Sequence, residues 1–186
     1  MYKKFLSHLV LVSCFAIFLF SCSKEDIIIN DRPEPSAPPY SDGFFVITEG
    51  SYGQTSGTIQ FYAYGADTVS TKAFEEENPG KITSNAAKTS TLQFATMYRK
   101  KLYLISEMNG PVIKLDAGTL KEEARYNQET SNWRSLIGIK NNEGLISAND
   151  GVYTVNLSTL TPQYKLTSVS AVNTGDMLIT GNYVYI

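Results

Sequence analysis

Short segments rich in β-branched and aromatic residues recur along the second half of the sequence at a fixed spacing. Residues 102–106 are matched by residues 144–147 and again by residues 184–186, at spacings of 41 and 40 residues. Residues 112–120 are matched by residues 152–160, again 40 residues later. A repeat of about 40 residues with several short strands in each unit is typical of β-propeller blades. This repeat therefore predicts a propeller.

One repeat shows its strands clearly enough to assign each of them. Alternating or apolar runs predict strands at 135–140, 143–148, 151–157 and 162–167. The segment 149–151, Asn-Asp-Gly, separates the second run from the third. These residue types tolerate the positive φ of a primed hairpin turn, so we expect such a turn there.

An earlier and longer unit occupies residues 44–74. Residues 45–48 and 58–62 match the second and third strands of a blade, which leaves 49–57 as an expanded loop and 75–91 as the crossing to the next blade. The expected fold is all-β, a β-propeller with blades of four antiparallel strands. A β-sandwich with a coincidental repeat is the alternative.

About three blades fit in the chain, whereas closed propellers have about 4–8. The sequence also stops at residues 183–186, inside what should be a second strand. We therefore expect this chain to be an N-terminal fragment of a longer protein, or a truncated product. Its unpaired last blade would favour aggregation.

The N-terminus has the features of an export signal. Lys3 and Lys4 precede an apolar stretch at 9–20, which is too short for a comfortable membrane span of about 20 residues. The stretch ends in residues 19–22, Leu-Phe-Ser-Cys, which resemble the lipobox of bacterial lipoproteins. The resemblance implies that residues 1–21 are cleaved and that Cys22 carries lipid. An ordinary secretory signal is the alternative.

The residues behind Cys22 bear on location and domain organisation. Ser-Lys-Glu-Asp at 23–26 resembles the surface-export signal of lipoproteins in gut-dwelling Gram-negative anaerobes, which implies an outer-membrane protein exposed at the cell surface. A solvated tether without an export role is the alternative. Four prolines at 33–39 favour an extended spacer. We expect a lipidated, proline-rich tether at 22–42 and a propeller domain at 43–186.

Without the leader, the composition excludes several functions. The chain then has no histidine and a single cysteine, Cys22, which argues against Ser-His-Asp catalysis, disulfides and zinc sites of His and Cys. The remaining 14 basic and 18 acidic residues give a net charge of −4, and no basic run stands out. We therefore expect no nucleic-acid partner.

Several segments resemble one known family. Residues 44–53 and 57–62 resemble the opening of surface lipoproteins with YVTN/YncE-like seven-bladed propellers, and residues 101–106 with 112–116 resemble one of their blades. Some members of this group look like cobalamin-capturing proteins that sit over a TonB-dependent transporter. The resemblance implies a surface capture or binding propeller, with cobalamin as one candidate ligand among several. We expect no cofactor.

Candidate ligand-binding residues lie in the expected loops at one end of the blades, because propellers bind ligands at the mouth of the central channel. Trp133 would stack on a flat ligand such as a corrin or a sugar ring. Alternatively, Trp133 fills the space between two blades. The candidates are Glu49, Tyr52, Asn109, Asn132, Trp133, Arg134, Asn149 and Asp150, with Met108 and Ser131 beside them.

Two acidic groups suggest other functions. The run 75–78, Glu-Glu-Glu-Asn, offers oxygen ligands for Ca²⁺, but without ligand alternation a solvated loop is the better interpretation, and we expect no metal site. Glu107 and Asp150 could form a glycosidase pair. We expect a binding module rather than an enzyme. A carboxylate-dependent glycan-processing enzyme and an adhesive or structural surface protein remain the alternatives.

Overall fold

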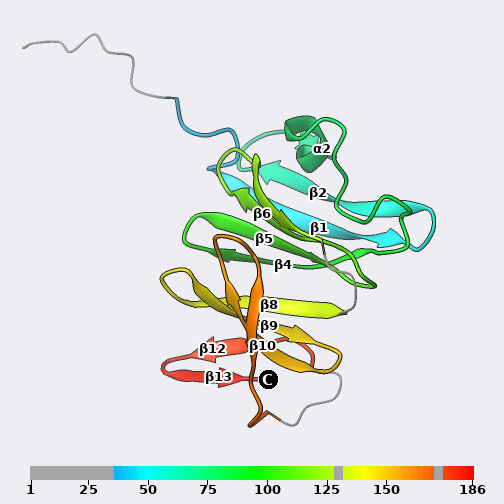
Figure 1. Cartoon of the computed structure of the whole chain (residues 1–186). Helices are drawn as coiled ribbons and strands as arrows, with labels where there is room; N and C mark the ends of the chain where they lie inside the picture. Colours follow the sequence, from blue (N-terminus) through cyan, green and yellow to red (C-terminus); the bar gives the residue numbers. More distant parts are fainter. Residues whose placement is uncertain (1–35, 128–131, 170–173) are drawn as a thin grey trace, which may run out of the picture. The chain divides into compact units, whose positions relative to one another are not determined.

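Four antiparallel β-sheets make up almost all of the chain that the structure describes. Figure 1 shows this computed structural model, which describes residues 36–127, 132–169 and 174–186. The predicted export signal, Cys22 and Ser131 lie outside those ranges. The first sheet, in spatial order, contains β1 (Gly43–Ser51), β2 (Thr55–Ala63) and β3 (Val69–Ser70).

The next two sheets have four strands each. The second sheet contains β4 (Leu92–Tyr98), β5 (Lys101–Ser106), β6 (Val112–Asp116) and β7 (Glu122–Tyr126). The third contains β8 (Trp133–Lys140), β9 (Glu143–Ala148), β10 (Gly151–Asn156) and β11 (Pro162–Lys165). The fourth is the hairpin of β12 (Leu178–Thr180) and β13 (Tyr183–Tyr185).

These sheets confirm the predicted all-β class and the repeat. The four strands of the third sheet follow the predicted ranges to within two residues at each end, and each pairs with the next in sequence. The described helix is α2 (Ala73–Glu77), a single short turn in the segment expected to be a crossing. The arrangement is a partial, propeller-like β fold.

The position of β1 in its sheet follows from two contacts at equivalent strand ends. Gln93 at the start of β4 donates a hydrogen bond of 2.5 Å to Glu49 near the end of β1. In the same way, Arg134 at the start of β8 forms an ion pair of 3.3 Å with Glu107, directly after β5. β1 therefore corresponds to β5, the second strand of its sheet, as predicted. No first strand stands beside it among the described residues.

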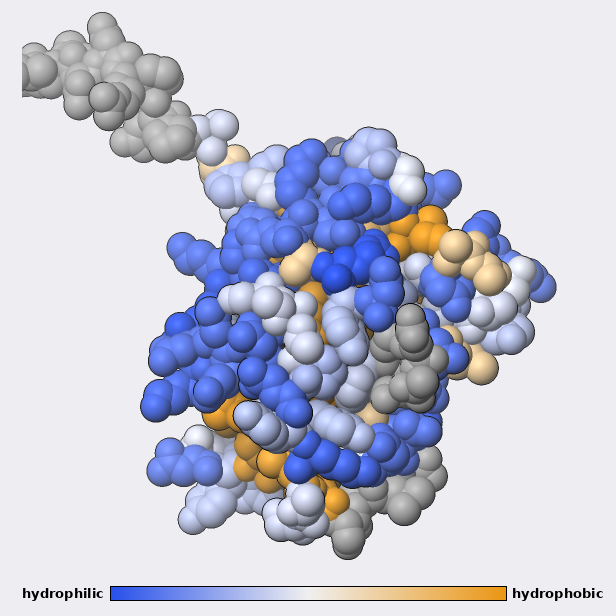
Figure 2. Space-filling view, viewed as in Figure 1, coloured by the Kyte–Doolittle hydropathy of each residue, from blue (hydrophilic) through white to orange (hydrophobic). Residues whose placement is uncertain are grey.

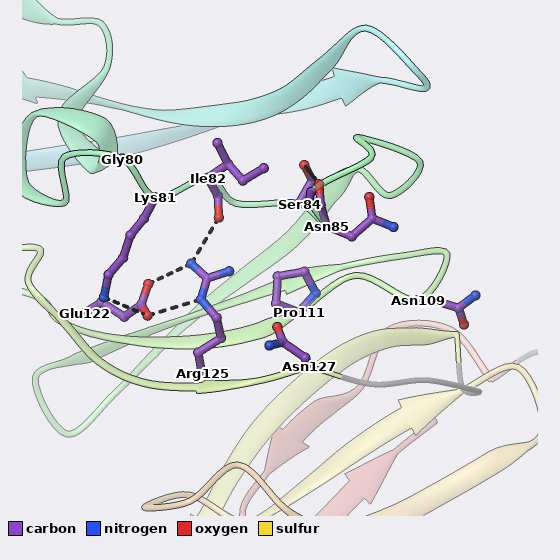
Figure 3. Close-up of a pocket in the computed structure, with 11 residues that line it drawn as sticks. Gly80, Lys81, Ile82, Ser84, Asn85, Asn109, Pro111, Glu122, Arg125 and Asn127 are labelled. Atoms are coloured by element: carbon purple, nitrogen blue, oxygen red, sulfur yellow. Dashed lines mark hydrogen bonds and ion pairs between the residues drawn. The ribbon is translucent and has the colours of Figure 1, made fainter.

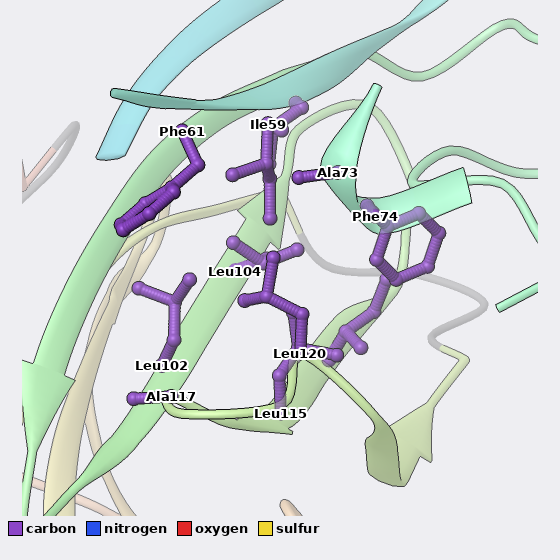
Figure 4. Packing of buried hydrophobic residues seen from close by; sticks show 11 residues of the cluster. Ile59, Phe61, Ala73, Phe74, Leu102, Leu104, Leu115, Ala117 and Leu120 are labelled. Carbon is purple, nitrogen blue, oxygen red and sulfur yellow. The ribbon is translucent and has the colours of Figure 1, made fainter. Parts of the chain in front are cut away.

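The second sheet is buried on both faces, and the alternation of β5 shows why. Leu102 and Leu104 point toward the first sheet, where Figure 4 shows them packed with residues of β2 and α2. Tyr103 and Ile105 point the other way, into a cluster shared with the third sheet. Each fully buried aliphatic side chain contributes about 1.5–3 kcal/mol, so stacking of sheets supplies the main stabilisation.

A turn motif repeats with the sheets. The Asp116 carboxylate accepts hydrogen bonds of 3.1 Å from the backbone N–H groups of Gly118 and Thr119. Asn156 makes the same two bonds 40 residues later. Each turn ends in a fully buried leucine with left-handed backbone, Leu120 at φ 53° and Leu160 at φ 60°. Burial of the leucine offsets the strain that this φ imposes on a side chain.

The structure corrects two local predictions. The strands β1 and β2 extend through most of residues 49–57, so the expected long loop is only residues 52–54. The 149–151 segment does form the β9–β10 hairpin, but Gly151 alone has positive φ there. Two consecutive residues with positive φ occur instead in other hairpins, at Arg99 and Lys100 between β4 and β5 and at Met108 and Asn109 between β5 and β6.

Folded contacts begin before Gly43. The compact unit runs from Ala37 to Ile186. The Tyr40 backbone N–H donates to the Gly118 carbonyl at 3.0 Å, and its ring packs edge-on against Phe61 with centroids 5.1 Å apart. The last residues of the expected tether therefore lie against the sheets.

The fourth sheet is one place where apolar side chains reach the surface. Leu178 and Ile179 on β12 are exposed, and Figure 2 shows hydrophobic atoms gathered over this region. Their exposure agrees with a sheet that has only two strands here. Within the described residues, no helix is long and apolar enough to cross a membrane.

Candidate functional site

Loops from several sheets meet at one end of the strands and are bonded to one another. The segments that lead into β4, β8 and β12 form hydrogen bonds with the β1–β2, β5–β6 and β9–β10 hairpins, respectively. The three bonds are Gly53 N–H to Lys88 O (2.8 Å), Met108 N–H to Asn132 Oδ1 (2.7 Å) and Ala148 N–H to Thr174 Oγ1 (3.2 Å). These bonds fix the loop end in one arrangement.

A cleft of about 570 Å³ opens beside these loops. It lies between the segment that follows α2 and the strands β6 and β7, as Figure 3 shows. Its volume falls within the range of about 300–1,000 Å³ typical of small-molecule sites. Polar side chains that line it are Lys81, Ser84, Asn85, Asn109, Glu122, Arg125 and Asn127.

One wall of the cleft is a three-residue charge cluster. Arg125 donates to both carboxylate oxygens of Glu122, at 3.1 Å from Nε and 2.7 Å from Nη2, and Nη2 also donates to the Ile82 carbonyl at 3.0 Å. Lys81 Nζ lies 3.0 Å from Glu122 Oε1. Burial raises the pKa of Glu122, but the hydrogen bonds from Arg125 and Lys81 outweigh burial and lower the pKa below its ordinary value. The cluster carries one net positive charge.

A β-bulge brings this cluster together. Glu122 and Arg125 are an odd number of residues apart on β7, so regular alternation would point them to opposite faces. Leu115 pairs with Glu122 and Lys114 pairs with Ala124, which leaves Glu123 as the extra residue. The bulge returns Arg125 to the side of Glu122. Sequence reasoning missed Glu122 and Arg125 for this reason, because nothing in the sequence of the strand marks the bulge. It also missed Lys81 and Asn127, which lie outside the strand.

The comparison with known families agrees with a single domain over most of the chain. The model of DUF5074, a domain of unknown function, matches residues 42–186. The chain belongs to the DUF5074 family. No curated protein sequence matches it. Membership in this family leaves function to be argued from the residues themselves.

Among the predicted ligand-binding residues of this DUF5074 chain, Asn109 lines the cleft. Met108 and Asn109 form the β5–β6 turn with φ of 54° and 63°. Asn132 and Arg134 lie close by, and both are engaged: Asn132 accepts the Met108 N–H, and Arg134 pairs with Glu107. The structure thus brings the predicted β5–β6 and β7–β8 residues together.

The remaining predicted loop residues lie elsewhere at this end. Glu49 is in β1 rather than in a loop and accepts from Gln93, and Tyr52 is exposed in the short β1–β2 turn. The Asn149 N–H donates to the Asn132 carbonyl at 3.1 Å. None of these three residues lines the cleft.

Asp150 forms a separate cluster on β9–β11. Its carboxylate accepts a hydrogen bond of 2.6 Å from the Tyr153 hydroxyl and pairs with Lys165 at 3.2 Å. These interactions, led by the Tyr153 hydrogen bond, hold the pKa of Asp150 below its ordinary value. The ammonium of Lys165 also lies 5.7 Å from the Tyr153 ring centroid. Asp150 therefore has a local structural role.

Trp133 is a core residue. It is the first residue of β8, it is 3 % exposed, and its ring packs edge-on against Tyr153 with centroids 5.4 Å apart. This placement corresponds to the alternative interpretation, in which Trp133 fills the space between sheets. With its ring covered, it offers no open face for a flat ligand here. Its indole N–H has no hydrogen-bond partner among the described residues.

The acidic run on α2 is divided among separate partners. Glu75 accepts from Thr58, Glu76 accepts from Ser70, and Glu77 pairs with Lys121 at 3.0 Å. Across the described ranges, no group of three acidic, histidine or cysteine residues could hold a metal ion. The three carboxylates anchor α2 to its surroundings.

Proposed function

We propose that this chain is a binding module of the bacterial cell surface, a lipid-anchored propeller that captures a small ligand and delivers it to, or docks on, an outer-membrane transporter. The observation that carries the proposal is the cleft of about 570 Å³ beside the bonded loop end. Side chains there present hydrogen-bond donors on a fixed scaffold, which is the arrangement of a binding site.

Ion pairing at this end favours binding over hydrolysis. A glycosidase needs two carboxyl groups about 5–10 Å apart, one of them free to give up a proton. Glu107 pairs with Arg134, and Asp150 pairs with Lys165. Glu122 is held by Arg125 and Lys81. The pKa values of Asp150 and Glu122 lie below their ordinary values, and a carboxylate that stays ionised makes a poor general acid.

Among ligands, a glycan suits the cleft better than a corrinoid. The cleft offers amide and guanidinium groups, which hydrogen-bond to sugar hydroxyls. Stacking on a corrin would use an open aromatic face, and Trp133 is covered. Cobalamin remains the second ligand to test, because the resemblance to YVTN/YncE-like surface propellers suggests it.

Isothermal titration of the purified protein against a glycan panel and cobalamin tests the proposal. Saturable binding that weakens in Asn109→Ala, at the cleft, but not in Tyr52→Ala, exposed outside it, would support a capture site. Binding insensitive to Asn109→Ala would contradict this location. Absence of binding across the panel would favour docking or adhesion to another protein.

The membrane anchor is tested separately at Cys22. We expect the mature N-terminal peptide to begin at Cys22 and to carry acyl chains, measured by mass spectrometry. Cys22→Ser should move the protein from the membrane fraction to the soluble fraction, and protease treatment of intact cells should degrade the wild type. An N-terminus that begins elsewhere, or an unmodified Cys22, would contradict the lipoprotein interpretation.

A further inference from the structure

We infer that the cleft binds a monoanionic sugar, one that carries a carboxylate together with free hydroxyl groups. This inference rests on the proposed binding function and specifies its ligand class. Three observations carry it: the net charge of the cleft wall, the unused donors that face the cleft, and the way the wall is held in place.

The charge balance of the wall favours a single negative charge. Lys81 and Arg125 supply two positive charges, and Glu122 neutralises one of them. The Glu122 side chain is 8 % exposed, so its charge is largely withdrawn from the opening, whereas that of Lys81 is 48 % exposed. One carboxylate on a ligand would neutralise the remaining charge. A doubly charged phosphate would leave an excess negative charge against buried Glu122.

Unused donors mark where the ligand would bind. Arg125 uses Nε and Nη2 for Glu122 and Ile82, and within the described chain its Nη1 has no partner. Lys81 Nζ makes one bond, to Glu122, of the three it can donate. These two groups suit a carboxylate, because hydrogen bonds between ionised partners are about twice as strong as neutral ones.

The hydroxyl-binding part of the site is formed by two asparagines. The side-chain amides of Asn109 and Asn127 line the cleft and form no hydrogen bond with any other described residue. Each amide offers a donor and an acceptor, which is the combination that a sugar hydroxyl needs. Pro111, which Figure 3 shows between Arg125 and Asn109, lines the cleft and provides an apolar surface for the face of a sugar ring.

The wall is organised before any ligand arrives. Arg125 is fixed by its two bonds to Glu122 and by the Ile82 carbonyl. Holding the guanidinium in place lowers the entropy cost of binding, which raises affinity. The charge that recognises the carboxylate therefore does not need to be ordered by the ligand.

Two lysines provide a matched test. Lys81 and Lys121 each pair with a glutamate at 3.0 Å, but only Lys81 lines the cleft. We would titrate the full protein and its Lys81→Gln and Lys121→Gln variants with galacturonic acid, which carries a single carboxylate, and with the neutral sugar galactose. We expect the acidic sugar to bind at least about tenfold more tightly than the neutral one at low salt, as one charged hydrogen bond supplies.

The outcomes separate the inference from the proposed function. Lys81→Gln should remove most of the preference for the acidic sugar, Lys121→Gln should leave it unchanged, and Asn127→Ala should weaken both sugars. Equal binding of acidic and neutral sugars, or equal effects of the two lysine variants, would overturn the carboxylate inference while keeping a glycan-binding module. Binding of neither sugar would overturn the inference and count against the proposed function at this cleft.

Discussion

The two left-handed leucines give a sharp test of how the repeated turn is stabilised. Leu120 and Leu160 combine positive φ with complete burial. Replacing a buried leucine by alanine costs about 2–5 kcal/mol of unfolding free energy. Alanine keeps a Cβ, so it also keeps the left-handed strain of about 1–2 kcal/mol, which glycine relieves. The glycine variant gains stability from this relief of strain, but about 0.5–1 kcal/mol of the gain is lost because glycine gives the unfolded chain more conformational freedom.

We predict that the usual order of stability, in which an alanine variant is more stable than a glycine variant, is reversed at the two left-handed leucines. At Leu120 and Leu160 the glycine variant should be more stable than the alanine variant by about 0.5–1 kcal/mol. At Leu115, equally buried but in the extended strand β6, alanine should be more stable than glycine by about 0.5–1 kcal/mol.

Urea denaturation can measure all six variants through the fluorescence of Trp133, the single tryptophan, which is 3 % exposed and becomes solvated on unfolding. If alanine matches or exceeds glycine in stability at both Leu120 and Leu160, backbone strain does not limit the repeated turn and the reasoning is wrong.

Two further predictions test the ion pair and the packing between sheets. A hydrogen bond from Lys101 lowers the pKa of Asp116. At pH 7 the wild type should therefore exceed Asp116→Asn in stability by up to about 1 kcal/mol, and this difference should disappear as pH falls through the pKa of Asp116 in the folded protein. A difference that persists at low pH in urea denaturation would contradict this. A Cβ on Gly138 would lie 2.3 Å from the Tyr98 ring, so Gly138→Ala should lower the free energy of unfolding by about 1–3 kcal/mol, measured by urea denaturation. Gly175 has open space around it, so Gly175→Ala should change the stability little.

The sequence was sufficient for the repeat because the same interactions recur in it at a fixed spacing. Asp116 and Asn156 each bond the two backbone N–H groups that begin the turn, so the side chain that forms the turn is visible in the sequence. The alternation of β5 likewise reflects burial on two faces. The strand positions of the third sheet followed from these local features.

The candidate site could not be predicted in the same way because it depends on a bulge and on distant segments. Arg125 reaches Glu122 only after the extra residue Glu123 changes the alternation of β7. Lys81 comes from the segment after α2, 41 residues before Glu122 in the sequence. Trp133 was assigned to a loop, whereas β8 already begins at this residue and places its ring in the core.

Some polar loop residues hold neighbouring loops in place, and this leaves others available to bind a ligand. Asn132 uses its side-chain oxygen to hold the β5–β6 turn, and Thr174 holds the β9–β10 hairpin at the corresponding place. These two side chains of the crossing segments are thus committed to the scaffold. Asn109 sits on the turn that Asn132 fixes, and its own amide makes no bond within the described chain. A free polar group on a loop fixed by its neighbour loses little entropy on binding, so Asn109 combines the two properties that recognition requires.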